Sequence, residues 1–110
     1  MVDTMRDWKW SPAEKAVARR AFDGALHGEL EAVMRETRER AARISEPSDL
    51  WQLERWLGER RREIDEKYDY RYSVLPMVFG RLVREGRLSV EDLQGLEPQK
   101  IAAFRSWAEV

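Results

Sequence analysis

Cysteine is absent from this 110-residue sequence, and histidine occurs only once, as His27. Without cysteine, the chain has no disulfide, no thiolate metal site and no thiol nucleophile. No second histidine stands at ligand spacing from His27, so we expect a partly exposed helical side chain rather than a metal ligand or an acid-base group. The sequence also has no glycine-rich phosphate loop and no nucleophile elbow. These absences argue against an enzyme, and we expect no cofactor.

Long apolar runs and an excess of charge of one sign are missing as well. A membrane-spanning helix needs about 20 apolar residues and a secretory signal needs an apolar core, so we expect a cytoplasmic protein with no integral membrane segment. The 20 lysines and arginines nearly balance the 21 acidic residues, and the two kinds are interleaved along the chain. A nucleic-acid binder concentrates basic charge in order to displace counterions from phosphates. We therefore expect no nucleic-acid partner.

Helical signals are what the sequence does contain. The segment WSPAEK holds a capping box, with Ser11 as the cap, Pro12 in the first turn and Glu14 three residues after the serine. The segment SEPS ends this helix, because Pro47 disfavours helical geometry in the residue before it. Ser48 is then expected to cap a second helix.

Each of these two helices carries apolar residues at steps of three and four. The stripes are Phe22, Leu26, Leu30, Val33, Thr37, Ala41 and Ile44 in the first helix, and Leu50, Leu53, Leu57, Ile64 and Tyr68 in the second. We expect the two stripes to pack on each other in an antiparallel helical hairpin.

The segment KYDYRYS places three tyrosines at alternate positions, Tyr68, Tyr70 and Tyr72. Alternation is typical of a strand. Helical spacing resumes directly afterwards over residues 74–83, however, so a strand here would have no partner. We interpret the segment as a break between helices, with Asp69 or Ser73 as the cap of a third helix.

The rest of the chain predicts short helices. Gly86 is expected to end the third helix, Ser89 and Asp92 form a second capping box, and a last helix runs from about Pro98 to about Trp107. The chain is thus predicted to be one all-α domain. A loose N-terminal arm (1–10) precedes a long antiparallel helical hairpin, or stalk (11–68), and a compact head of shorter helices (69–110). Because an elongated shape leaves apolar surface uncovered, we expect a homo-oligomer.

Trp51 points to a second surface of the second helix. At about 100° per residue, it lies about 130° from the leucine stripe and beside Arg55. Tryptophan with arginine is the usual composition of an interaction hot spot, and the alternative is a tryptophan lying flat under neighbouring side chains. We hypothesise that two copies of the second helix cross antiparallel near Arg55 and Trp56. Trp51 would then lie opposite Arg60 or Arg61 of the second copy.

The stretch DLWQLERWLGERRREIDEKYDYRYSVL closely resembles the fluorescence recovery protein family of cyanobacteria, as do WSPAE and VFGRLVREG. These motifs occur in family order from about Trp10 to near Leu96. The resemblance implies an all-helical, mainly dimeric regulator without catalytic chemistry. It implies binding to the C-terminal domain of photoactivated orange carotenoid protein, faster return of that protein to its orange form, and an end to quenching at phycobilisomes. The implied location is the cytoplasm, at the thylakoid surface if the organism is a cyanobacterium.

The resemblance also assigns individual residues. The interface tryptophan of the family corresponds to Trp51 and its interface arginine to Arg61. Where the family commonly has an acidic partner for that arginine, this chain has Arg55, so either Glu54 takes over the pairing or the dimer is rearranged or weaker. Taken together with the helix crossing hypothesised above, the expected dimer residues are Trp51, Glu54, Arg55, Trp56, Arg60 and Arg61. The implied partner-binding residues are Trp51, Arg61, Met77, Phe79 and Lys100.

Two of these assignments depart from the family pattern. Met77 stands where the family has an aromatic residue that is implicated in partner binding, and Lys100 matches a family lysine only with a gap. At the junction of stalk and head, Tyr68 is expected to pack, Asp69 to cap and Arg71 to form an ion pair. Three alternatives stay open: a divergent homologue with another protein partner, a scaffolding helical dimer, and a nucleic-acid binder with salt-sensitive retention on DNA or RNA.

Overall fold

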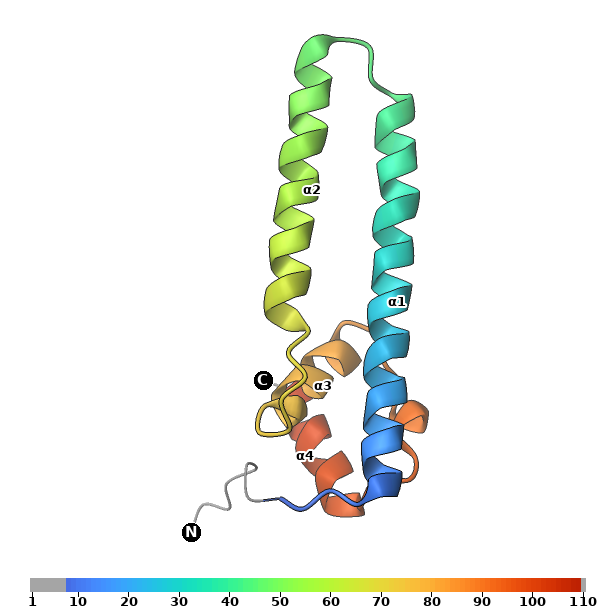
Figure 1. The fold of residues 1–110 in the computed structure, drawn as a ribbon, viewed down its shortest axis with the longest axis vertical. Coiled ribbons are helices and arrows are strands. Elements are labelled where there is room, and N and C mark those ends of the chain that lie inside the picture. Colours follow the sequence, from blue (N-terminus) through green and yellow to red (C-terminus); the bar gives the residue numbers. More distant parts are fainter. Residues whose placement is uncertain (1–7, 110) are drawn as a thin grey trace.

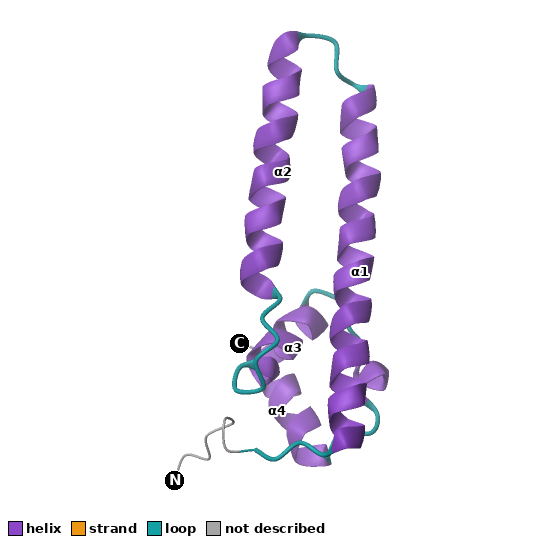
Figure 2. Cartoon of the chain, in the orientation of Figure 1, coloured by secondary structure: helices purple, strands orange, loops and turns teal. Residues whose placement is uncertain are grey.

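The computed structural model describes residues 8–109, and within that range the chain is helical with no strand (Figures 1 and 2). The elements in chain order are α1 (Pro12–Ala42), α2 (Pro47–Lys67), α3 (Leu75–Arg84), the 3-10 helix η2 (Val90–Leu93) and α4 (Pro98–Ala108). The molecule measures 57 × 25 × 22 Å along its principal axes. This confirms the predicted all-α fold, a long helical hairpin followed by a head of shorter helices. Residues 1–7 of the predicted arm lie outside the described residues.

Helix α1 begins at the predicted capping box. Ser11 Oγ accepts a hydrogen bond from the N–H of Glu14 at 3.1 Å, and Glu14 Oε1 accepts one from the N–H of Ser11 at 3.1 Å. With 31 residues at about 1.5 Å each, α1 is about 46 Å long. One continuous helix therefore belongs to the head at its N-terminal end and to the stalk at its C-terminal end (Figure 1).

The start of α2 corrects the prediction that Ser48 caps it. The N-cap residue is Glu46, and Pro47 is the first helical residue. Asp49 Oδ2 accepts hydrogen bonds from the N–H groups of Ser45, at 3.0 Å, and Glu46, at 3.1 Å. The bonds from Ser45 and Glu46 hold the pKa of Asp49 below its usual value. The carboxylate reaches back over the turn, and Pro47 has no N–H that needs a cap.

The start of α3 also differs from the prediction. Its N-cap residue is Val74, without a side-chain hydrogen bond, so neither Asp69 nor Ser73 is the cap. Pro76 lies in the first turn, where a missing backbone N–H costs nothing.

The end of α3 is the one predicted from Gly86. This glycine has a φ of +76°, a conformation that residues with a side chain rarely adopt. Its N–H donates to the carbonyl of Val83 at 3.0 Å, and the N–H of Arg87 donates to the carbonyl of Leu82 at 2.8 Å, which is a Schellman motif. The second predicted capping box is also present, since the N–H of Ser89 donates to Asp92 Oδ2 at 2.9 Å.

The hydrophobic core lies in the head and is shared by α1, α3, α4 and the segment between α3 and α4. Its buried members are Val17, Ala18, Ala21, Phe22, Ala25, Leu75, Val78, Phe79, Leu82, Leu88, Leu93, Leu96 and Phe104. Within the core, α3 and α4 pack closely, with the rings of Phe79 and Phe104 edge to face at 5.3 Å. The head is thus the packed part of the molecule, and the stalk projects from it.

The seam of the stalk corrects part of the prediction that the two apolar stripes pack on each other: Ile64 is buried and Val33, Thr37 and Leu53 are half-buried, but other members of the stripes are exposed. Between the helices, the guanidinium of Arg40 on α1 lies 4.4 Å from the ring centroid of Trp56 on α2. Leu57 follows Trp56 directly, so its side chain points about 100° away from that of Trp56. Leu30, Leu50 and Leu57 are 42%, 48% and 37% exposed. Long polar side chains and a tryptophan bridge the helices, and much of the leucine stripe faces outward.

Candidate functional site

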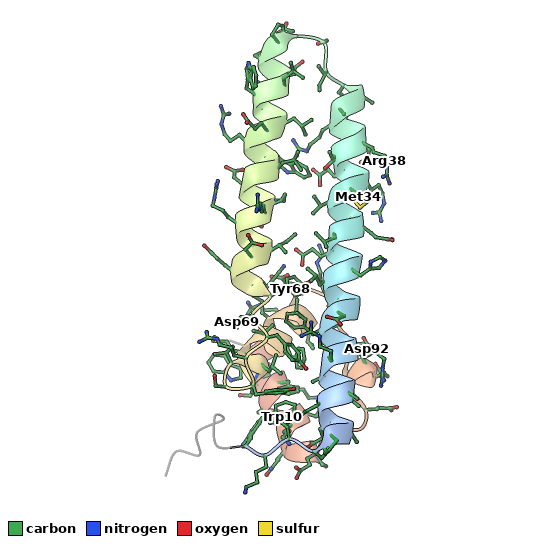
Figure 3. The ribbon with its side chains drawn as sticks, viewed as in Figure 1. Trp10, Met34, Arg38, Tyr68, Asp69 and Asp92 are labelled. Atoms are coloured by element: carbon green, nitrogen blue, oxygen red, sulfur yellow. The ribbon has the colours of Figure 1, made fainter. Side chains whose placement is uncertain are left out.

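The stalk carries most of the large apolar side chains that the described residues expose. Five of them, which we call the stalk face, are Leu30, Met34, Leu50, Trp51 and Leu57. Leu30 and Met34 are one turn apart on α1, and Figure 3 shows Met34 projecting from the front of that helix rather than toward α2. The two exposed leucines of α2, Leu50 and Leu57, are rotated from Trp56 in the same direction, so they lie on the same side of the stalk as Leu30 and Met34. Trp51, at 61% exposure, lies at the outer edge of that side.

Charged side chains flank the stalk face on α2. Glu54 and Arg61 are seven residues apart, so they share one side of the helix, between the leucines and Trp51. The Arg61 side chain is 85% exposed, and its Nε lies 3.8 Å from Asp65 Oδ2. Arg55 is exposed further round the helix. The exposed guanidinium groups of Arg55 and Arg61 and the exposed ring of Trp51 can form cation-π contacts or ion pairs with a second molecule.

Trp56 and Arg60 differ from this group, because the hairpin itself uses them. The Trp56 ring lies 4.4 Å from the Arg40 guanidinium and 5.9 Å from that of Arg60. Arg60 Nη2 donates to Glu63 Oε1 at 2.7 Å. Trp56 therefore faces α1 and is half-buried within one copy of the chain.

A cleft of about 300 Å³ opens on the head beside the end of α2, and we call it the head cleft. Its apolar lining residues are Val74, Met77, Val78 and Trp107. Its charged lining residues are Glu66, Lys67, Asp69, Arg71, Arg81 and Arg84, an excess of two positive charges in a chain whose net charge is -1. Met77, at 46% exposure, is an accessible apolar side chain at this site.

Phe79 and Lys100, both predicted to contact a partner, are 0% exposed. The Lys100 Nζ donates to Glu14 Oε1 at 2.8 Å, to the carbonyl of Lys9 at 2.7 Å and to Glu97 Oε1 at 3.2 Å. It also lies 4.7 Å from the ring centroid of Trp10. This corrects the expectation of direct contact, since Lys100 ties the segment before α1 to α4. A resemblance aligns positions, but it carries no information on how deep each side chain lies in this chain.

The junction tyrosines pack in the head rather than facing solvent. Tyr68 donates its hydroxyl hydrogen to Glu29 Oε1 at 2.8 Å, and burial together with this carboxylate raises the pKa of Tyr68. The rings of Tyr68 and Tyr70 contact Phe22 edge to face, with centroids at 5.4 and 4.9 Å. Tyr72 continues the cluster to Trp10, at 5.1 Å. Aromatic packing thus accounts for the alternation of the tyrosines.

Asp69 and Arg71 form an ion pair at the rim of the head cleft. Arg71 Nε donates to Asp69 Oδ1 at 2.9 Å, and its Nη2 donates to Oδ2 at 2.6 Å. The Arg71 guanidinium holds the pKa of Asp69 below its usual value. This pair closes the non-helical turn between α2 and α3.

A partly buried ion cluster joins the end of α2 to α1 and α3. We call it the junction network, and its members are Glu29, Lys67, Arg81, Glu85 and Arg87. Lys67 Nζ donates to Glu29 Oε2 at 2.8 Å and to Glu85 Oε1 at 2.7 Å, and the Lys67 side chain is only 4% exposed. Each carboxylate has a second cation, Arg87 at 3.3 Å from Glu29 and Arg81 at 2.9 Å from Glu85. No motif in the sequence indicated this network.

Among residues 8–109, no group of three or more histidine, cysteine, aspartate or glutamate side chains is placed to hold a metal ion. The helices of the same part of the chain include none with the length and apolar character needed to cross a bilayer.

The chain is similar to a known protein family in both sequence and structure. The family described as photoprotection regulator fluorescence recovery protein matches residues 10–108. The fluorescence recovery protein of Synechocystis sp. PCC 6803 is 36% identical over 101 residues, which are 92% of this chain and 93% of that protein. The solved structure of that protein aligns with a TM-score of 0.89 at 35% identity and covers 93% of this chain and 100% of its own. The structure of the Fremyella diplosiphon fluorescence recovery protein aligns with a TM-score of 0.88 at 40% identity, with the same coverage.

Proposed function

Because this chain belongs to the fluorescence recovery protein family of photoprotection regulators, we propose that it regulates by binding another protein, without catalysis. The proposed partner is the C-terminal domain of photoactivated orange carotenoid protein. Binding speeds the return of that protein to its orange form and ends quenching at the phycobilisome, in the cytoplasm. The observation that carries the proposal is the pair of accessible apolar surfaces, the stalk face and the head cleft, on a chain of this family.

The stalk face is the proposed contact between two copies of the chain. Exposed large apolar side chains that gather on one side of a protein are typical of an interface. A two-fold axis makes such a surface self-complementary, because each copy presents the same residues. With Trp56 facing α1, the contact is built on Trp51 and the leucines, with Arg61 and Glu54 at their side. Arg61 of one copy then reaches Trp51 or Glu54 of the other.

Replacing Trp51 with alanine is expected to convert the dimer to a monomer at micromolar chain concentration. A tryptophan that becomes buried in an interface contributes about 2–4 kcal/mol on truncation, or roughly a 30- to 1000-fold rise in Kd. The molar mass should be measured by sedimentation or light scattering over a dilution series, with helix content checked by circular dichroism. Arg35→Ala is the control, since Arg35 is exposed on α1 and lies about 100° round that helix from Met34. A Trp51→Ala protein whose mass stays that of the parent at low concentration means that the stalk face is not the interface.

The head cleft is the proposed contact with the carotenoid protein. Its apolar lining residues can pack on an apolar side chain of the partner. Its excess of positive charge can pair with acidic residues beside that side chain. We expect Met77→Ala to weaken the complex about tenfold, because the variant loses roughly 1.4 kcal/mol of apolar contact. Binding should be measured by titration against the isolated C-terminal domain. Ala102→Glu, at an exposed position of α4, is the control and should bind as the parent does. Equal affinity of Met77→Ala and the parent would place the partner elsewhere on the molecule.

The decisive experiment for the function is the rate of dark red-to-orange recovery of photoactivated orange carotenoid protein. It is measured with and without this protein, and the mixture is passed over a sizing column. The proposal requires a faster recovery and co-elution of the two proteins. If neither is seen, the chain is a family member with another protein partner, or a scaffolding dimer. Salt-sensitive retention on DNA or RNA would mark the nucleic-acid alternative.

A further inference from the structure

Helices α1 and α2 are joined to the head in different ways. Helix α1 enters the head without a break, and its residues Val17, Ala18 and Phe22 belong to the hydrophobic core. Helix α2 ends at Lys67, and a non-helical segment leads from it to α3 (Figure 1). The position of α1 relative to the head is therefore fixed by the helix itself, whereas that of α2 depends on side-chain contacts.

Two of these contacts are made by Lys67, the last residue of α2. Its ammonium group bridges Glu29 on α1 and Glu85 at the end of α3, at 2.8 and 2.7 Å. Hydrogen-bonded pairs of this kind, removed from solvent, resist the screening that weakens surface pairs. One buried lysine thus holds the lower end of α2 to both of its neighbours.

Residues of the junction network also line two different clefts. A cleft of about 440 Å³ between α1 and α2 is lined by all five network residues, together with Trp56 and Arg60. Two of the five, Lys67 and Arg81, also line the head cleft. Arg81 is 44% exposed and holds Glu85 at 2.9 Å, so a group in the head cleft reaches it without unfolding the head.

We propose that the junction network is a latch that fixes α2 against α1 and the head, and that an anionic group in the head cleft loosens it by drawing Arg81 away from Glu85. The network holds three cations and two carboxylates, so one positive charge is left for such a group. When the latch loosens, α2 shifts relative to α1. Because Trp51 and Leu57 lie on α2 while Leu30 and Met34 lie on α1, this shift divides the stalk face.

Spin-label distances test the latch directly, because the chain has no cysteine of its own. One pair of labels joins α2 to the head, through Glu59→Cys and Arg105→Cys. A second pair joins α1 to the head, through Glu39→Cys and Arg105→Cys, and all three positions are exposed. Labelled chain is diluted in an excess of unlabelled chain so that distances within one chain dominate.

Two variants open the latch to different extents. Lys67→Met removes both bonds of the lysine, yet Glu29 keeps Arg87 and Glu85 keeps Arg81, so each buried carboxylate retains a cation. Arg81→Gln mimics the withdrawal of Arg81 and leaves the lysine in place. Arg35→Met, at an exposed position of the stalk, controls for the loss of one charge. Circular dichroism confirms that each variant keeps its helix content.

The expected result is a broader, shifted α2–head distance distribution in Lys67→Met, a smaller broadening in Arg81→Gln, and the parent distribution in Arg35→Met. The α1–head distribution stays unchanged in all three, because α1 is continuous with the head. An α2–head distribution in Lys67→Met that superimposes on that of the parent overturns the latch. A parent-like distribution in Arg81→Gln overturns the part assigned to the head cleft.

Discussion

Replacing Gly80 with alanine is expected to destabilise the protein by about 2–3 kcal/mol, although alanine is the better helix former by about 1 kcal/mol. A Cβ atom at Gly80 would overlap the Cβ of Trp107 and lie 3.0 Å from the backbone nitrogen of Ala108. Neither neighbour is the end of a flexible side chain, so α3 and α4 would have to separate. Phe79 is one residue away and 0% exposed, so the separation would disturb the centre of the core.

Thermal unfolding at equal chain concentration measures this effect, and the transition should fall by about 10–15 °C for a domain of this size. Gly24→Ala is the matched control within α1. Nothing lies within 4 Å of a Cβ atom placed at Gly24, so this variant should gain about 1 kcal/mol from helix propensity. The two substitutions are chemically identical and opposite in expected sign. A Gly80→Ala protein as stable as the parent would show that α3 and α4 are packed less closely than described.

Replacing Lys100 with methionine is expected to cost about 3–5 kcal/mol, because it leaves the buried Glu14 carboxylate without its cation. The Lys100 side chain is 1% exposed and that of Glu14 is 6% exposed, so water does not replace the lost partner. The carbonyl of Lys9 loses its donor as well. Denaturant unfolding measures the loss. Arg105→Met, an exposed position on the same helix, should change the unfolding free energy by less than about 0.5 kcal/mol.

The pH dependence of the same pair supplies a second readout. Burial acts to raise the pKa of Glu14, but hydrogen bonds from Lys100 and from the N–H groups of Glu97 and Ser11 outweigh it and hold the pKa below its ordinary value of 4.5. Glu14 therefore stabilises the fold fully above about pH 4.5, and this contribution is lost as the pH falls through the folded-state pKa. In Lys100→Met a neutral Glu14 needs no cation. The stability difference between parent and variant should shrink from pH 7 to pH 3, and a constant difference would contradict the ionic account.

The features that could be predicted from the sequence are those that a few neighbouring residues determine. The capping boxes at Ser11 and Ser89 and the stop at Gly86 each depend on groups within five residues of one another, so the residue types and their spacing were sufficient. The exposure of Trp51 also followed from helical geometry, because its angle to the apolar stripe depends only on residue number.

The cap of α2 shows how a local prediction fails. Both Ser48 and Asp49 can accept hydrogen bonds, and the choice depends on whether Pro47 lies inside the helix or before it. The structure places Pro47 inside, and Asp49 reaches the two free N–H groups. The dipeptide pattern does not distinguish these cases, because each side chain has backbone N–H donors within reach: those of Ser45 and Glu46 for Asp49, and those two or three residues further along the chain for Ser48.

By itself the sequence determined the all-α class, the ends of most helices, the family and the exposure of Trp51, because each follows from local spacing or from motif order. Only the tertiary structure decided which side of each helix is covered. In the folded chain, Trp56 faces α1, Leu50 and Leu57 are exposed, and Phe79 and Lys100 are buried in the head. The physical reason is that burial depends on residues far away in the chain. Glu14 and Lys100 are 86 positions apart, and Glu29 and Lys67 are 38 apart, yet each pair meets only when the helices pack.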